Sequence, residues 1–140
     1  MALKSTGKSH IVELLRSHDV YPTQQRVEIG RIVLARSQHL SADQVMAMVN
    51  SDGRAVVSKA TVYNTLGLFA DKGLVREVIV DPAKVFYDSN TSTHHHFYNK
   101  TTGELADIEA DQLVVNNLPE LPAGAEIDGV DVVIRIHNKA

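Results

Sequence analysis

Apolar positions recur at helical spacing through the first part of the chain. Residues 9–18 predict a short amphipathic helix, and a second helix is expected to begin after Thr23, a good N-cap residue. A third is predicted after Ser41, because Ser41 and Gln44 have the spacing of a capping box. The positions expected to face a core on these three helices are Ile11, Leu14, Leu15, Val27, Ile32, Leu34, Val45, Met48 and Val49.

The clearest helix pattern lies between Ser58, a suitable N-cap, and Gly73, a suitable C-terminal stop. Two β-rich runs follow, at 74–80 and 84–88, joined by a turn at Asp81-Pro82-Ala83. Helices, a longer helix and then a hairpin are the layout of a winged helix-turn-helix. In that layout the helix before the hairpin enters the DNA major groove. Its expected buried stripe is Val62, Leu66 and Phe69.

After Asp88 the spacing of apolar residues favours mainly strands. Residues 93–99 and 104–109 predict two strands, and residues 110–118 predict a short helix. Residues 130–138 predict a strand with apolar residues on both faces, which indicates cover on both sides. A unit this small is expected to bury apolar surface by dimerising.

We therefore predict an α+β chain with two domains. Residues 1–88 would form an N-terminal winged helix-turn-helix domain, and residues 89–140 a small α/β dimerisation domain.

Composition excludes several kinds of site, and the distribution of charge favours a DNA-binding part. The chain has no cysteine, which excludes disulfides, thiolate zinc sites and iron–sulfur clusters within it. Its start lacks the apolar core of a signal peptide and no run reaches membrane-spanning length, so we expect a cytoplasmic protein that does not bind membranes. The net charge is −3, but residues 1–88 hold 11 Lys and Arg against 9 Asp and Glu, and residues 89–140 hold 3 against 8. This asymmetry is typical of a DNA-binding part joined to a different module.

A histidine triplet at 94–96, within STHHHFYNKTTGEL, is the strongest sign of chemistry. On a strand the outer two histidines share one face and the middle one points away. Imidazoles with nearby carboxylates suit zinc, iron or manganese, although a solvent-exposed polar strand is the simpler interpretation. The candidate metal ligands are His39, Asp88, His94, His96 and Asp107.

A candidate DNA-reading surface lies on the helix before the hairpin. Its polar face can contact base edges, and basic residues on it and around it suit phosphates, although most such faces are merely solvated. The candidate DNA contacts are Arg26, Lys59, Tyr63, Asn64 and Lys84.

Four motifs, YPTQQR, HLSADQV, SKATVYNTLGLFADKGLV and FYDSNTSTHHHFY, resemble the ferric uptake regulator superfamily across nearly the whole chain. The segments THHHFY, GELADIE and LPELPAGAEIDGVDVVIRI are most similar to its iron response regulator (Irr) branch. The resemblance implies a homodimeric transcription factor of iron or haem homeostasis that binds an AT-rich palindromic operator. It is not expected to be an enzyme.

The resemblance also implies site residues. The superfamily's regulatory metal site between the two domains maps onto His39, Asp88, His94, His96 and Asp107, and in the Irr branch the triplet His94, His95 and His96 is implicated in haem binding. The superfamily's structural zinc is expected to be absent, because its Cys-x-x-Cys position here reads Asn99-Lys100-Thr101-Thr102. The alternatives left open are a metal-dependent repressor without a haem response, a His/Asp metalloenzyme, and a haem-binding module with no DNA role.

Overall fold

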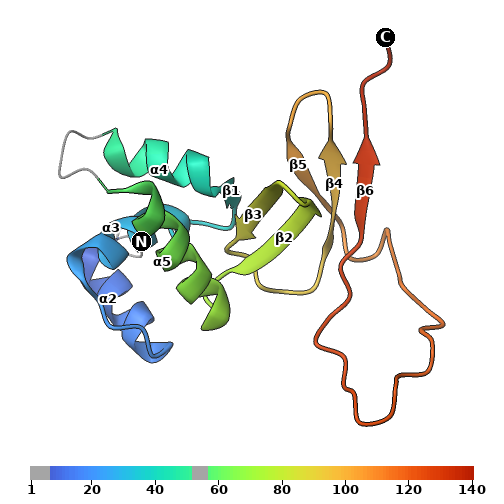
Figure 1. The fold of residues 1–140 in the computed structure, drawn as a ribbon, viewed down its shortest axis with the longest axis horizontal. Coiled ribbons are helices and arrows are strands. Elements are labelled where there is room, and N and C mark those ends of the chain that lie inside the picture. The colour runs from blue at the N-terminus through green and yellow to red at the C-terminus, as the bar shows by residue number, and fades with distance from the viewer. Residues whose placement is uncertain (1–6, 52–56) are drawn as a thin grey trace. The chain divides into compact units, whose positions relative to one another are not determined.

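The computed structural model describes residues 7–51 and 57–140. The chain divides into two compact units, Met1–Thr91 and Ser92–Ala140 (Figure 1). The first unit continues beyond the boundary predicted at Asp88. The reason is that Ser89 is held by Gln38, whose backbone N–H donates to the Ser89 hydroxyl at 3.0 Å and whose carbonyl accepts from the Ser89 N–H at 2.9 Å.

The first unit is mainly helical. Thr23 and Ser41 cap their helices as predicted, and Ser41 and Gln44 form the expected capping box. Ser58 caps the last helix, and Gly73 follows its end with a φ of 81°, a conformation that favours glycine. The described helices are α2 (Lys8–Ser17), α3 (Gln24–Val33), α4 (Ala42–Asn50) and α5 (Lys59–Asp71).

The core of this unit confirms the predicted stripe of α5, since Val62, Leu66 and Phe69 are all buried. One expectation is wrong, since Met48 on α4 is exposed. On α3 the expectation is confirmed, because Val27 is buried and Ile32 and Leu34 are half-buried and pack against the core. Ile29, Gly30 and Val33, which were not predicted, are buried more deeply than those two residues.

Gly30 lies on the deeply buried face of α3. A Cβ at this position would lie 3.0 Å from Ile11 Cγ2, so the missing side chain lets α2 pack closely against the α3 backbone. The face that carries Gly30 therefore points inward.

Three antiparallel strands complete the first unit: β1 (His39–Ser41), β2 (Arg76–Asp81) and β3 (Lys84–Asp88), in the order β1-β3-β2. The β2–β3 hairpin matches the prediction, and its turn is fixed by the Ala83 N–H, which donates to Asp81 Oδ1 at 2.8 Å. Strand β1 was not predicted, because three residues are too few to display an alternating pattern. It pairs with β3 so that His39 lies opposite Asp88.

The second unit is a sheet of β4 (His95–Asn99), β5 (Leu105–Ile108) and β6 (Val133–Ile136), in the order β5-β4-β6 (Figure 1). Strands β4 and β6 run parallel, and β4 and β5 run antiparallel. The α+β class is confirmed. Side chains on β6 stay partly exposed, with Ile134 and Ile136 each at 38 %, so the expected cover on both faces is missing within this chain.

The helix predicted at 110–118 is wrong. Residues 92–140 are all described, and none of them is helical. Val114 and Leu118 are 65 % and 47 % exposed, and an isolated short helix without a packing partner is marginal in water. Asn117 adopts a φ of 55°, and Pro119 disfavours helical geometry at Leu118. In the part of the chain that the structure describes, no helix has the length and apolarity needed to cross a membrane.

Replacing Ser41 by alanine is expected to destabilise the first unit by about 1 kcal/mol, because the cap of α4 would lose its acceptor for the Gln44 N–H. Chemical denaturation measures this loss. The exposed Ser51, which follows the C-terminus of α4, supplies a matched Ser-to-Ala control that should change stability by much less. Equal stability of Ser41→Ala and the unaltered protein would contradict the prediction.

Candidate metal centre and DNA-facing surface

The second unit brings His96 and Asp107 together by strand register. They are direct partners on the antiparallel strands β4 and β5, and His96 Nε2 lies 3.2 Å from Asp107 Oδ1. His96 is 1 % exposed, whereas the Asp107 side chain is 49 % exposed. The pair therefore joins a buried nitrogen ligand to a carboxylate that solvent can reach.

His94 lies on the same side as His96, as the alternation predicted, and their ring centroids are 4.5 Å apart. His94 Nδ1 lies 2.7 Å from the Ser92 carbonyl oxygen, which can only accept, so Nδ1 carries the proton. In the neutral ring the lone pair is then on Nε2, which lies 3.5 Å from Asp107 Oδ1. A carbonyl that fixes the other ring nitrogen is the usual support of a metal-binding histidine.

The three donor groups fit one cation. Their potential ligand atoms all lie within 4.8 Å of one another. Bonds of about 2.1 Å in tetrahedral or octahedral geometry would place neighbouring donors roughly 3.0–3.4 Å apart. The 3.2 and 3.5 Å contacts of Asp107 Oδ1 with the two imidazoles are close to this range. Two imidazole nitrogens and a carboxylate suit zinc, iron or manganese.

His95 has a different environment. It is 8 % exposed, and its Nδ1 accepts a hydrogen bond from the Val132 N–H at 3.1 Å. Because Nδ1 is the acceptor, a neutral His95 ring carries its proton on Nε2 and offers no free lone pair. In this arrangement His95 links β4 to the start of β6.

The other two predicted ligands lie in the first unit. His39 on β1 is opposite Asp88 on β3, and the edge of the His39 ring packs against Phe86, with ring centroids 6.3 Å apart. Asp88 Oδ1 accepts from the Asn90 N–H at 2.9 Å. The strand pairing thus brings this histidine and carboxylate together, although β1 itself was not foreseen.

The predicted DNA contacts all lie in the first unit. Lys59, Tyr63 and Asn64 are exposed on α5, and Lys59 Nζ lies 5.9 Å from the centre of the Tyr63 ring. Lys84 begins β3, directly after the hairpin turn, with its Nζ 5.4 Å from the centre of the Phe86 ring. Arg26 lies in the first turn of α3, where its guanidinium donates to the Tyr21 carbonyl at 3.0 Å.

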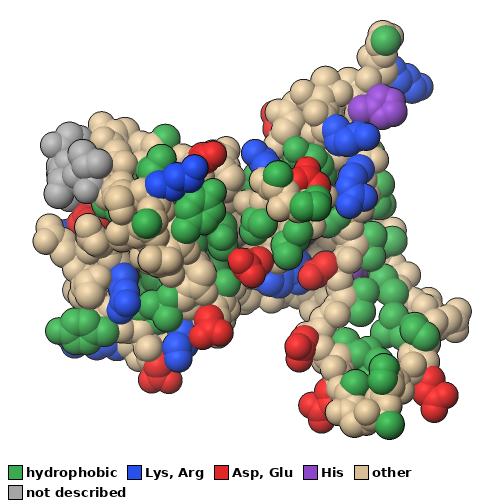
Figure 2. All heavy atoms as spheres, viewed as in Figure 1, with side chains coloured by type: hydrophobic (Ala, Val, Ile, Leu, Met, Phe, Trp, Pro, Cys, Tyr) green, Lys and Arg blue, Asp and Glu red, His purple; other side chains and the backbone are tan. Residues whose placement is uncertain are grey.

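Charge is unevenly distributed on the visible surface (Figure 2). Over the first unit, Lys and Arg side chains are interspersed with Asp and Glu, whereas the loop between β5 and β6 shows hydrophobic and acidic side chains. Residues 109–132 indeed contain no Lys or Arg. This loop is therefore a poor partner for nucleic acid.

Sequence reasoning missed two features of these sites. The Ser92 carbonyl that orients His94 is a backbone group, so no residue type could have revealed it. Thr65 lines a polar hollow with Arg26, Thr61 and Asn64. The sequence pattern does not mark it as a contact residue, because it lies on the buried side of α5.

Comparison with known proteins supports the fold and identifies the family. Residues 17–134 match the model of the ferric uptake regulator family. The chain is 32 % identical over 99 residues to the peroxide-responsive repressor PerR of Staphylococcus aureus; the match spans 71 % of this chain and 66 % of that protein.

Two solved structures share the fold. The ferric uptake regulator of Pseudomonas aeruginosa with manganese superposes with a TM-score of 0.68 at 22 % identity, covering 93 % of this chain and 98 % of that one. The ferric uptake regulator of Francisella tularensis with iron gives 0.66 at 24 % identity, covering 84 % and 91 %. The family's members are transcriptional regulators and not enzymes. Because the family model matches most of its length, this chain belongs to the ferric uptake regulator family.

Proposed function

We propose that this chain is a cytoplasmic, homodimeric transcriptional regulator whose affinity for operator DNA is controlled by a divalent metal. The observation that carries the proposal is the convergence of His94, His96 and Asp107, whose separations suit one ion, in a member of this family. Iron, manganese and zinc are all compatible with this donor set.

His39 and Asp88 would complete the coordination from the first unit. Metal held by ligands from both units would then restrict how the units move relative to each other. In a dimer, this restriction would set the spacing of the two α5 helices and hence the fit to DNA. Metal and DNA affinities would be linked reciprocally, each raising the other by the same factor.

The DNA-binding part of the proposal assigns α5 to the major groove. Tyr63 and Asn64 would face base edges, and Lys59, Arg26 and Lys84 would contact phosphates. The operator would be AT-rich and palindromic, because a two-fold dimer reads two equivalent half-sites.

Dimerisation would use the second unit. Ile134 and Ile136 on β6 are partly exposed, and Val114 and Leu118 in the preceding loop are exposed. A second copy of the chain would cover these side chains. Packing between the two copies would then stabilise the dimer without a zinc ion held by cysteines, since the chain contains no cysteine.

The test is fluorescence anisotropy of a labelled palindromic AT-rich duplex, measured at one fixed salt concentration with metal-free protein and with added manganese. We expect manganese to tighten binding by about 10-fold or more, within the usual range of coupling free energies. A scrambled duplex of equal length serves as the control. Equal affinity for both duplexes in every metal state would refute the proposal.

Haem is a second candidate effector, because an apolar hollow of about 370 Å³ adjoins the histidine triplet. It is lined mainly by Leu113, Val114, Leu118 and Val130, with His94 and His95 on its wall. His94 Nε2 would supply an axial ligand with its other nitrogen already fixed, and competition for His94 and His96 would displace the metal and release DNA. Ligation by His95 would require its bond to Val132 to break.

Alanine at both His94 and His96 is therefore expected to abolish any release of DNA by haem, whereas alanine at His95 should preserve it. Anisotropy with added haem makes the measurement, and an exposed histidine such as His10 provides the matched alanine control. Release that persists in the double variant would rule out haem control through this site.

A further inference from the structure

Helices α3 and α5 bring like ends together at two hollows in the first unit. The N-terminal hollow, of about 280 Å³, is lined by the first turn of α3 and by the first two turns of α5, and the C-terminal hollow, of about 340 Å³, is lined by residues just beyond the ends of both helices. The positive end of the α3 dipole lies at the first hollow, and the negative ends of both helices lie at the second. The N–H groups of Arg26 and Thr61 are bonded by the caps Thr23 and Ser58, so side chains would supply the donors to an anion in the first hollow.

The side chains of the N-terminal hollow agree with this polarity. It is lined by Thr23, Gln25 and Arg26 of the α3 start and by Thr61, Asn64 and Thr65 of α5, so no acidic group borders it. Neither helix has an acidic residue in its first turn. The hydrogen bond of Arg26 to the Tyr21 carbonyl holds its guanidinium in place and leaves further N–H donors for a ligand.

Thr65 is the unexplained group in this hollow. It is 5 % exposed, and it lines the hollow with Thr61 and Asn64 at the i, i+3, i+4 spacing of one helix face. A helical threonine often bonds the carbonyl four residues earlier. Here the Thr65 hydroxyl has no hydrogen-bond partner among residues 7–51 and 57–140. The hydroxyl is not one of the enclosed side-chain atoms that lack a partner, so it opens onto the hollow, where it can donate to a ligand oxygen.

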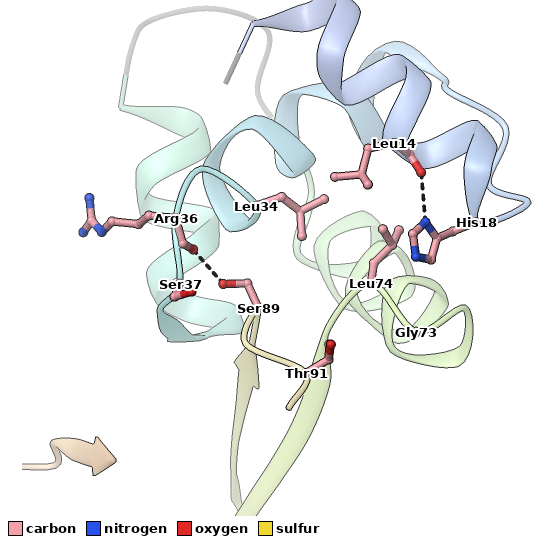
Figure 3. Close-up of a pocket in the computed structure, with 9 residues that line it drawn as sticks. All are labelled: Leu14, His18, Leu34, Arg36, Ser37, Gly73, Leu74, Ser89 and Thr91. Atoms are coloured by element: carbon pink, nitrogen blue, oxygen red, sulfur yellow. Dashed lines mark hydrogen bonds between the residues drawn. The ribbon is translucent and has the colours of Figure 1, made fainter. Parts of the chain in front are cut away.

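The C-terminal hollow lacks these features (Figure 3). Leu14, Leu34 and Leu74 form much of its lining, and His18 points back to the Leu14 carbonyl, 3.1 Å from His18 Nδ1. The Arg36 side chain extends away from the hollow, while its carbonyl accepts from the Ser89 hydroxyl at 2.7 Å.

A third hollow, between α4 and the β2–β3 hairpin, also suits anions poorly. Asp43 borders it, and Glu77 lies opposite Tyr87 across the hairpin. Burial raises the pKa of the Tyr87 phenol above its usual value, and the Glu77 carboxylate and Tyr63 raise it further. Lys84 borders this hollow together with Asp43, so its charges are mixed, whereas the N-terminal hollow has Arg26 and no acidic residue in its lining.

We infer that the N-terminal hollow, between the start of α3 and the first two turns of α5, binds a backbone phosphate of DNA, with the Thr65 hydroxyl as a neutral donor and the Arg26 guanidinium as the charged one. This inference rests on the proposed function. Asn64 lies both on this hollow and on the exposed face of α5, so a phosphate here would fix how deeply α5 enters the groove. Thr65 would thus be a positioning contact that applies to every DNA sequence.

The test compares Thr65→Val, which removes the hydroxyl at nearly constant shape, with Thr65→Ser, which keeps it. We expect Thr65→Val to weaken binding about 10-fold on operator and random duplexes alike, since a hydrogen bond to a charged group is lost. Its salt dependence should be unchanged because no charge is removed. Arg26→Gln should lower the slope of log K against log salt by about 0.9. Thr65→Ser should bind nearly as the unaltered protein does.

Thr91→Val is the matched control, because Thr91 borders the C-terminal hollow and should leave DNA binding unchanged. Affinity that follows the hydroxyl, retained in Ser and lost in Val, supports the inference. Equal binding by the Val and Ser variants, whether at full or reduced strength, overturns it. If the unaltered chain binds no DNA at all, the proposed function fails as well, so the two failures are distinguishable.

Discussion

Replacing His96 by alanine is expected to lower the affinity for manganese or zinc by more than about 100-fold, since changes even to groups that only support metal ligands typically cost 10- to 100-fold. His96 is 1 % exposed, and its Nε2 lies 3.2 Å from Asp107 Oδ1, so its removal takes one of the two imidazole donors from the candidate site. Competition with a metal-sensitive fluorescent chelator measures the affinity.

The change should also remove stabilisation by metal. A ligand that binds only the folded state at 100 times its Kd adds about 2.7 kcal/mol to the unfolding free energy. We expect manganese to raise the melting temperature of the unaltered protein and to leave that of His96→Ala nearly unchanged. His10→Ala, at an exposed histidine on α2, should respond as the unaltered protein does. A normal metal-induced shift in His96→Ala would show that the ion binds elsewhere.

The clustering of the candidate ligands His94 and His96 was predictable because strand alternation is a two-residue period. That period alone places His94 and His96 on one face, and the geometry follows it. The tautomers were not predictable, since they depend on the Ser92 carbonyl and the Val132 N–H. A sequence of three identical residues therefore conceals two different environments, that of a candidate metal ligand at His94 and that of a link between strands at His95.

The helices of the first unit were predictable from their N-cap residues and from the helical spacing of apolar residues. The predictions that failed, for Met48 and for a helix at 110–118, have physical causes. Met48 on α4 shows that apolar character alone does not select the buried face. On α3 the buried face includes Gly30, which no apolar pattern marks and which allows close contact with α2. The helix expected at 110–118 had an apolar face, but among residues 7–51 and 57–140 nothing covers Val114 and Leu118, which remain exposed. Tertiary packing, which a local pattern does not contain, decided both cases.

Replacing Phe69 by alanine is expected to destabilise the first unit by about 3–5 kcal/mol, a large share of the 5–15 kcal/mol typical of a domain. Phe69 is fully buried on the inner face of α5, and its ring approaches Gly30 on α3. Loss of the ring opens a cavity behind the helix that is proposed to read DNA. We expect specific DNA binding to be lost at temperatures where the unaltered protein is still folded.

Because the chain forms two compact units, Phe69→Ala is expected to destabilise the first unit and to leave the second folded. Hydrogen exchange followed by mass spectrometry should show faster exchange across α2–α5 in Phe69→Ala, while the β4–β5 amides keep their protection, because His94, His96 and Asp107 belong to a separate compact unit. Phe97→Ala, at a side chain that is 36 % exposed on β4, is the matched control and should leave α2–α5 protected. Equal loss of protection in both units of Phe69→Ala would mean that the chain unfolds as one cooperative body. In that case metal at the second unit would stabilise the DNA-binding helices through folding itself, and no change in the orientation of the units would be needed to explain metal control.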